Sequence, residues 1–262
     1  MELDQVSEVY RAYKSAEVSP LIHPDDLMHQ TGAEHYVSVG LSAMHIILRG
    51  LALSWLPAVS SILDLPCGHG RVARHLRAAF PYARMVFCDV DKSGVAFCAE
   101  TFKGQGVYSK PDLTQVELPM VDLIWVGSLF THVDLMRTTT WLRFLARHLS
   151  ENGVLIATFH GLFFKEMVKS EPLTGGVDWP SVLSQYQEIG YGYVPYTDFE
   201  MGDYGVSLSK ASLIMDIATA IPGTRVLGYT ERGWSDNHDV LILGKTDRFL
   251  SFDSSGVSRR AR

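Results

Sequence analysis

Apolar residues recur at helical spacing through the first part of the chain. Residues 6–16 form a short amphipathic stretch, and residues 35–55 carry apolar side chains at the intervals of one helix face. Pro57 ends the second stretch, because proline disfavours helical geometry in the residue before it. We therefore predict an N-terminal helical cap over residues 1–57.

Between residues 58 and 161, short apolar runs alternate with helical stretches. The runs predict buried strands at residues 61–65, 85–88, 107–108, 121–126 and 154–159. Helices are predicted between them, with Asp91 as an N-cap and Asn152-Gly153 as the stop of a helix over residues 135–149. This alternation predicts an α/β fold with a doubly wound parallel sheet, which binds its ligands at the carboxyl ends of the strands.

The alternation lapses over residues 162–205, which are rich in glycine, proline and aromatic residues. We predict that this insertion is a lid over the substrate site. A packed satellite core is an equally good interpretation of the aromatic cluster at residues 179–199.

Regular patterning returns in residues 206–246. A helix at residues 210–221 and strands at 225–229 and 240–243 are predicted to complete one mostly parallel seven-stranded sheet with helices on both faces. The remaining residues, 247–262, are polar and predict a flexible tail.

A glycine-containing turn follows the first predicted strand. Gly68 and Gly70 allow the backbone to approach a ligand closely, and the helix that follows offers free N–H groups to an anion. Asp89 ends the second predicted strand, where a carboxylate can accept hydrogen bonds from both hydroxyls of a ribose. Gly68, Gly70 and Ala73 also fit the relaxed dinucleotide fingerprint, so a nicotinamide cofactor has to be weighed as well.

Several motifs in a consistent order make residues 60–161 resemble the class I S-adenosylmethionine-dependent methyltransferases. They are DLPCGHG at 64–70, VFCDVD at 86–91, PDL at 111–113, VDLIWVGSLFTHV at 121–133 and LSENGVLI at 149–156. The chain departs from the family pattern at Pro66, where the family usually has its first glycine. Because proline fixes φ near ~−65°, the turn cannot need a positive φ at that position.

The resemblance implies S-adenosylmethionine as the cofactor and gives roles to individual residues. Asp89 would bind the ribose, Asp112 would accept a hydrogen bond from the adenine amino group, and Leu113 would pack on the adenine ring. The predicted cofactor-binding residues are Asp64, Gly68, Gly70, Asp89, Val90, Asp112, Leu113 and Ser128. For the aspartates, the alternative is that each only caps a following helix or turn.

The expected reaction is an in-line displacement at a sulfonium, for which the protein supplies alignment and, for a hydroxyl acceptor, a base. His132, His160 and His238 are predicted at the active edge of the sheet, and histidine suits a base because its pKa is close to neutral. We select His132 and His160 as candidate catalytic residues. The competing roles are structural or cofactor-lining for His132, and a hydrogen-bonded structural role for His160. We predict no metal site.

Composition and charge limit the kinds of binding partner that the sequence predicts. The formal net charge of −6 makes nucleic acid an unexpected partner, because a phosphate backbone repels an acidic chain. The three cysteines are not clustered like metal ligands and indicate reduced thiols in the cytoplasm. The acidic start of the chain lacks a signal-peptide core, and the apolar run at residues 41–56 is shorter than the ~20 residues of a membrane span. We expect a cytoplasmic monomer or homodimer that acts on a small-molecule acceptor and has no membrane partner.

Two other functions compete with methyl transfer. An NAD(P)-dependent oxidoreductase would need a catalytic tyrosine and lysine after the fourth strand, whereas Tyr10 and Lys14 precede the glycine turn. A non-catalytic subunit that binds S-adenosylmethionine would account for Pro66 and for the lack of an obvious base. The chain also lacks the Asn/Asp-Pro-Pro-Tyr run of enzymes that methylate flipped bases.

Overall fold

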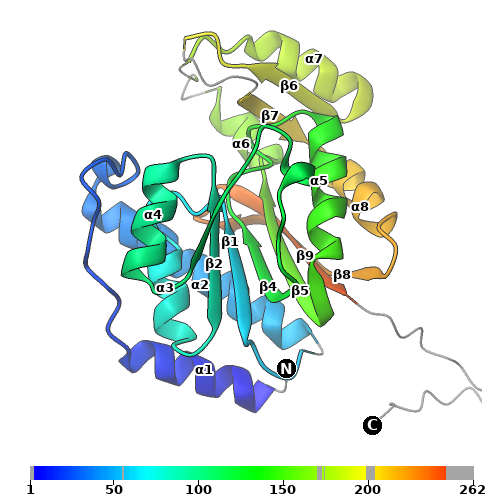
Figure 1. The fold of residues 1–262 in the computed structure, drawn as a ribbon. Helices are drawn as coiled ribbons and strands as arrows, with labels where there is room; N and C mark the ends of the chain where they lie inside the picture. The colour runs from blue at the N-terminus through cyan, green and yellow to red at the C-terminus, as the bar shows by residue number, and fades with distance from the viewer. Residues whose placement is uncertain (1–2, 55, 170–172, 174, 199–203, 246–262) are drawn as a thin grey trace, which may run out of the picture.

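A seven-stranded sheet forms the centre of the computed structural model, which describes residues 3–54, 56–169, 173, 175–198 and 204–245 (Figure 1). The strand order is β3-β2-β1-β4-β5-β9-β8. Its strands are β1 (Ser61–Leu65), β2 (Arg84–Asp89), β3 (Gln105–Tyr108), β4 (Val121–Val126), β5 (Leu149–Phe159), β8 (Thr224–Trp234) and β9 (His238–Lys245). The first five are parallel, β9 is antiparallel to β5, and β8 is antiparallel to β9. The predicted α/β fold with a mostly parallel sheet of seven strands is confirmed.

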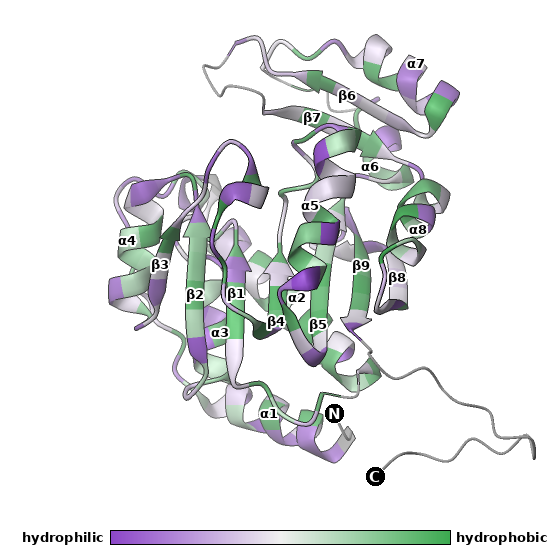
Figure 2. Ribbon diagram, turned by 45° about the vertical axis from the view of Figure 1, so that its right-hand side comes forward, coloured by the Kyte–Doolittle hydropathy of each residue, from purple (hydrophilic) through white to green (hydrophobic). Residues whose placement is uncertain are grey.

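Helices cover both faces of the sheet. One face carries α2 (Ala33–Leu53), α3 (Ala73–Ala79) and α4 (Lys92–Thr101), with α1 (Leu3–Ser15) packed on α2 and α3; the other carries α5 (Leu135–Arg147) and α8 (Ala211–Thr219). Successive residues of a strand point to opposite faces, so Ile62 and Leu63 belong to different hydrophobic clusters. Because both faces are covered, the central strands are apolar along most of their length (Figure 2).

Helix caps account for the element boundaries, and one predicted boundary is wrong. Asp91 accepts a hydrogen bond from Ser93 N and caps α4, as predicted. However, α5 already ends at Arg147 and β5 begins at Leu149. Asn152, with a φ of 62°, lies inside β5 where the register against β4 shifts. Asn152-Gly153 therefore belongs to an irregularity within the strand and is not a helix stop.

The insertion after β5 contains more regular structure than its sequence predicts. It holds α6 (Leu162–Met167), α7 (Trp179–Ile189) and β6 (Tyr191–Pro195), and β6 pairs with β7 (Gly205–Ser209) in a separate two-stranded sheet. The prediction that residues 206–246 all complete the main sheet is therefore wrong for β7. Residues such as Phe164, Val182 and Leu208 form a third hydrophobic cluster, so this segment packs a satellite core of its own. Phe199 of the aromatic cluster lies outside the described residues.

Strand β7 fastens the insertion to the carboxyl end of the main sheet. Gly205 N donates to His132 O at 3.0 Å, Ser207 N to Thr131 O at 2.9 Å, and Ser209 N to His160 O at 2.9 Å. These bonds place the insertion over the loops that follow β4 and β5, as Figure 1 shows.

Two sequence expectations concern regions remote from the sheet edge. Helix α2 is by length and composition able to cross a membrane, but ten of its residues are buried and it packs on β5 and β8 as a core helix. The predicted tail at 247–262 lies outside the described residues.

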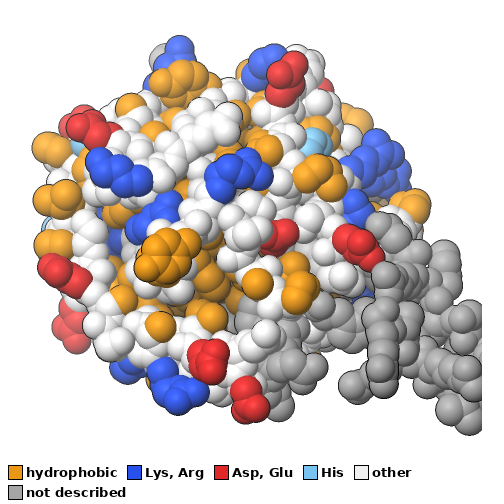
Figure 3. Space-filling model, turned by 60° about the horizontal axis from the view of Figure 1, so that its bottom comes forward, with side chains coloured by type: hydrophobic (Ala, Val, Ile, Leu, Met, Phe, Trp, Pro, Cys, Tyr) orange, Lys and Arg blue, Asp and Glu red, His pale blue; other side chains and the backbone are white. Residues whose placement is uncertain are grey.

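Cys67, Cys88 and Cys98 are buried and free. On the face opposite the insertion, basic, acidic and apolar side chains are interspersed (Figure 3).

Candidate active site

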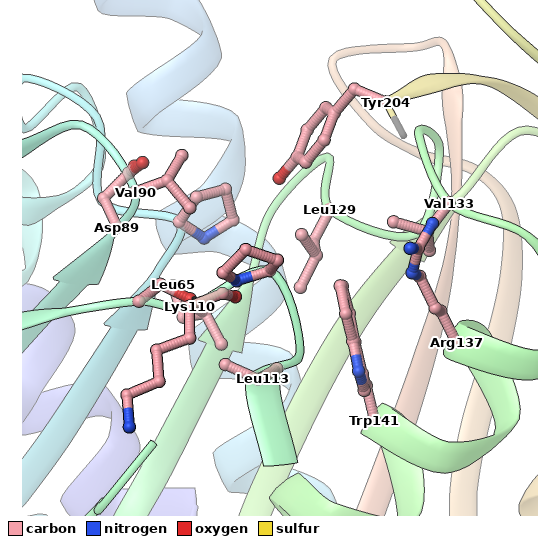
Figure 4. A pocket seen from close by; sticks show the side chains of 13 residues that line it. Leu65, Asp89, Val90, Lys110, Leu113, Leu129, Val133, Arg137, Trp141 and Tyr204 are labelled. Atoms are coloured by element: carbon pink, nitrogen blue, oxygen red, sulfur yellow. Dashed lines mark hydrogen bonds between the residues drawn. The ribbon is translucent and has the colours of Figure 1, made fainter. Parts of the chain in front are cut away.

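A cleft opens at the carboxyl ends of β1 and β2, next to the insertion. Its empty volume is about 810 Å³, including its open mouth. In Figure 4, Asp89 and Val90 lie on one side, Arg137 and Trp141 lie on the other, and Tyr204 reaches toward the cleft from above. The lining residues are Leu65, Pro66, Asp89, Val90, Ser109, Lys110, Pro111, Leu113, Leu129, Val133, Arg137, Trp141 and Tyr204.

The glycine turn borders this cleft and needs both of its glycines. Gly68 has a φ of 47° and Gly70 a φ of 83°, in the left-handed region that disfavours other residues. A Cβ on Gly70 would lie 2.3 Å from Phe102 Cε2, so this glycine allows close packing on α4. A Cβ on Gly68 would meet no atom within 4 Å, so the space beside this residue is open. Positive φ falls on these two glycines and not on Pro66, as the sequence required.

Two buried carboxylates lie at the ends of β1 and β2. Asp89 accepts hydrogen bonds from Gly68 N at 2.7 Å and from Asp91 N at 3.0 Å, which joins the glycine turn to the end of β2. Asp64 is only 2% exposed, and its Oδ2 has no hydrogen-bond partner among the described residues. Burial raises the pKa of both, and for Asp64 the charge of Asp89 raises it further. A cationic group in the cleft would compensate these carboxylates.

The apolar part of the cleft suits a planar ring. Val90 is 55% exposed although it is apolar, and Leu113 lies below it in the lining of the same cleft. The packing of Leu113 on adenine and the contact of Val90 with the cofactor stay predictions, for which the cleft provides an apolar lining.

Five of the eight predicted cofactor residues are not in the cleft lining: Asp64, Gly68, Gly70, Asp112 and Ser128. Asp112 accepts hydrogen bonds from Thr114 N and Thr114 Oγ1 at 3.0 and 2.8 Å and caps the short 3-10 helix η2 (Leu113–Gln115). These hydrogen bonds lower its pKa. Ser128 N donates to Thr158 Oγ1 at 2.8 Å, which ties the loop after β4 to β5. A cofactor contact of either side chain stays a prediction.

The cleft also contains residues that sequence reasoning missed. Arg137 and Trp141 lie one helical turn apart on α5, and this spacing in a helix that follows β4 could have identified them. Tyr204 gives no such signal, because it reaches the cleft only through the pairing of β6 with β7.

Three histidines gather beside the cleft, where β4, β5 and β9 meet the insertion. The ring centroids of His132 and His160 are 6.4 Å apart, and those of His160 and His238 are 4.9 Å apart. The ring of His160 stacks flat on Phe164, with 3.4 Å between the ring centroids. The ring of His132 stacks on Tyr204, with 5.8 Å between the centroids. The structure therefore brings together the candidate catalytic residues that the sequence placed on separate strand ends.

The backbone of β7 fixes the tautomer of two of these imidazoles. The Nδ1 atoms of His132 and His160 lie 2.8 Å from Gly205 O and 3.1 Å from Ser207 O. A carbonyl oxygen can only accept, so each Nδ1 carries the proton and, in the neutral ring, Nε2 keeps its lone pair. Burial lowers the pKa of His132 and, together with the neighbouring histidines, holds the pKa of His160 well below its ordinary value. Both rings are thus neutral near physiological pH and able to accept a proton.

The donor set fits S-adenosylmethionine better than a metal ion. Among the described residues, no group of histidine, cysteine, aspartate and glutamate side chains is arranged to hold a metal. In contrast, the cleft offers an apolar slot at Val90 and Leu113 and a carboxylate at Asp89. Beside it, at the end of β1, Asp64 has a buried carboxylate oxygen without a partner among the described residues. These match a nucleoside whose amino-acid end carries an ammonium group.

Known proteins support this assignment. A family model described as a methyltransferase domain matches residues 63–155. Similar solved structures include DesVI of Streptomyces venezuelae, with a TM-score of 0.56 and 15% identity over 86% of this chain and 99% of that one. The sugar N-methyltransferase KedS8 of a Streptoalloteichus species has a TM-score of 0.56 and 14% identity, over 89% and 97% of the two chains.

A third similar structure contains a bound ligand. The magnesium protoporphyrin IX methyltransferase ChlM of Synechocystis, with bound SAH, has a TM-score of 0.51 and 13% identity over 92% of this chain and 95% of that one. No curated protein matches the sequence. At these identities the structures establish a shared fold.

Proposed function

We propose that the chain is a class I S-adenosylmethionine-dependent methyltransferase that methylates an oxygen or nitrogen atom of a small-molecule acceptor bound beside His132 and His160. The observation that carries this proposal is the pair of imidazoles whose Nδ1 atoms lie within hydrogen-bond distance of β7 carbonyls beside the cleft. A hydroxyl acceptor loses a proton as it is methylated, and an ammonium acceptor must lose a proton first to free its lone pair. A neutral imidazole can take that proton in either case.

The bound cofactor supplies an electrophilic methyl group. In our proposal Asp89 accepts hydrogen bonds from the ribose hydroxyls, since a carboxylate keeps lone pairs beyond those that face Gly68 N and Asp91 N. Val90 and Leu113 hold the adenine ring between them. Asp64 pairs with the ammonium group of the cofactor, which gives its unsatisfied Oδ2 a partner.

The lone pairs on Nε2 of His132 and His160 are the proton-accepting groups in this account. We expect these rings to act without prior deprotonation, because each is already neutral near physiological pH. The β7 carbonyls at Gly205 and Ser207 are positioning groups, since they hold the Nδ1–H tautomer that leaves Nε2 unprotonated.

The choice of a small molecule rests on how the insertion restricts the space above the histidines. Strand β7 is hydrogen bonded across the loops after β4 and β5, and Phe164 covers one face of His160. A site enclosed in this way favours a compact acceptor over a polymer. KedS8 is a sugar N-methyltransferase and ChlM a magnesium protoporphyrin IX methyltransferase, and both agree with this class of acceptor.

The test is methyl transfer from labelled S-adenosylmethionine to a panel of phenols, amino sugars and hydroxy acids, with tRNA and a mixed protein fraction alongside. We expect label only in small molecules. Replacing His160→Asn keeps a donor near the position of Nδ1 but removes Nε2, and it should lower kcat by roughly a hundredfold or more.

His148→Asn is the matched control, because His148, the C-cap of α5, makes the same kind of bond from Nδ1 to Phe144 O at 2.9 Å. It should leave kcat unchanged. Label that enters only tRNA or protein would contradict the proposed acceptor class. Full activity of both His132→Asn and His160→Asn would contradict the proposed bases.

A further inference from the structure

Arg71 follows the glycine turn directly and has no ionic partner. Its side chain is half-buried, and Cζ lies 5.8 Å from the ring centroid of Trp234. Within the part of the chain that the structure describes, no carboxylate lies within 4.0 Å of its guanidinium. Burying a charge without a counter-ion is unfavourable, so this arginine is prepared for an anionic partner.

Asp26 is the carboxylate whose charge acts on Arg71, and it already accepts hydrogen bonds from other residues. Asp26 raises the pKa of Arg71 against the larger opposite effect of burial, so some attraction exists between them. However, Asp26 Oδ2 accepts from Tyr36 OH at 2.7 Å, and Oδ1 accepts from Met28 N at 3.1 Å. These bonds hold Asp26 in the N-terminal segment and leave the guanidinium without a bidentate partner.

A continuous set of side chains joins Arg71 to the proposed base. Trp234 Nε1 donates to Val39 O at 3.0 Å, which fixes the indole ring beside Arg71. The centroid of His238 lies 5.1 Å from Trp234 and 4.9 Å from His160. We call Arg71, Trp234 and His238 the arginine cluster.

The arginine cluster is positive and contains no acid. Burial, with smaller effects of His132 and Arg71, lowers the pKa of His238 to about 3, so its ring is neutral and Arg71 carries the only charge among the three residues. The Nδ1 atom of His238 and the Oδ1 atom of the adjacent Asn237 are buried without partners among the described residues. In contrast, the charged groups at the glycine turn, Asp64 and Asp89, are both acids.

We propose that Arg71 binds a carboxylate of the methyl acceptor, so that the substrate is an acid methylated at a second, nearby atom. The fork of a guanidinium matches a carboxylate with two parallel hydrogen bonds. This inference rests on the proposed acceptor site at His160. It adds that the acceptor enters with its anionic end toward the β8–β9 hairpin.

Calorimetric titration of the full chain, first loaded with S-adenosylhomocysteine, separates this inference from the question of turnover. The probes are benzoate and its neutral analogue benzamide. We expect benzoate to bind roughly tenfold or more tightly than benzamide, because only benzoate offers a charged acceptor to the guanidinium. Arg71→Gln should remove this preference, Arg71→Lys should keep part of it, and the exposed Arg49→Gln should change nothing.

Affinity for S-adenosylhomocysteine shows whether each variant folds and keeps its cofactor site. The inference requires Arg71→Gln to bind it within about twofold of the unmodified chain, a range too small to mark a lost ion pair. It is overturned if the unmodified chain does not prefer benzoate. It is also overturned if Arg71→Gln weakens the binding of S-adenosylhomocysteine but not that of methylthioadenosine, because Arg71 would then hold the carboxylate of the cofactor. Neither result bears on His160→Asn, so the proposed function can stand or fall separately.

Discussion

Replacing Asp64 with asparagine should make the ligand-free protein more stable and at the same time weaken its binding of the cofactor. The carboxylate is buried, its Oδ2 lacks a partner among the described residues, and Asp89 adds a second negative charge nearby. Asparagine has almost the same shape without the charge. The substitution thus removes an unfavourable buried group that is kept for its ligand.

The burial of Asp64 sets the size of the gain in stability and of the loss of cofactor affinity. A buried acceptor without a partner costs about 1–3 kcal/mol, and asparagine keeps part of that cost because its amide is also polar. We expect a gain of about 1–2 kcal/mol, which in a chain of this size raises Tm by roughly 2–8 °C. Loss of a charge-assisted contact to the ammonium group should weaken the binding of S-adenosylmethionine by roughly 10- to 100-fold.

The pH dependence of the stability provides an independent test of the same reasoning. Burial raises the pKa of Asp64 in the folded chain, so protonated Asp64 favours the fold at low pH, and that stability is lost as pH rises from about 3.9 through the raised pKa. The advantage of Asp64→Asn over the unmodified chain should therefore be smallest in acid and grow as the pH rises. Urea unfolding across this range, with cofactor titration at neutral pH, measures both quantities.

Asp122→Asn is a control of opposite sign at the other end of the sheet. Asp122 accepts hydrogen bonds from the backbone and hydroxyl groups of Ser60 and Ser61, and from Ser150 Oγ at 2.5 Å. Burial alone would raise its pKa, but these bonds outweigh burial and lower it. Its replacement should cost about 1–2 kcal/mol after allowance for partial exposure and leave cofactor affinity unchanged. If Asp64→Asn instead destabilised the chain as Asp122→Asn does, the reasoning about Asp64 would be refuted.

Two further outcomes are expected. Gly70→Ala should destabilise the chain by roughly 1–3 kcal/mol in urea unfolding, because φ is 83° and the new Cβ would lie 2.3 Å from Phe102 Cε2; Gly32→Ala, where φ is 118° but no atom lies within 4 Å, separates backbone strain from the clash. Once an acceptor is found, kcat should stay constant as pH falls through 6.5 and decline only at the lowered pKa of His160, since a base must be unprotonated. A decline centred near 6.5 would contradict the buried, neutral state of His160.

Local patterns were sufficient to predict the sheet and the cofactor edge. Each parallel strand is a short apolar run between turn-prone residues, and because parallel strands end at the same edge, Asp64 and Asp89 had to come close together. The glycine turn was equally readable, since Gly68 and Gly70 take the positive φ that glycine favours.

Features that depend on contacts between distant segments were not readable. Strand β6 contains Gly192 and Pro195, which usually interrupt strands, and it forms because β7 pairs with it. Tyr204 reaches the cleft through this pairing, and the tautomers of His132 and His160 depend on carbonyls of β7. The Asp112 carboxylate accepts hydrogen bonds from Thr114 N and Thr114 Oγ1, and its contact with adenine stays a prediction.

The central claim is that the cofactor lies across the carboxyl ends of β1 and β2, in the cleft between Val90 and Leu113. A crystal structure of the chain with S-adenosylhomocysteine tests it most directly. We expect the adenine ring between these two side chains, the ribose hydroxyls on Asp89 and the amino group toward Asp64. Nucleoside density elsewhere, or a cleft left empty by a ligand that binds in solution, would contradict the account.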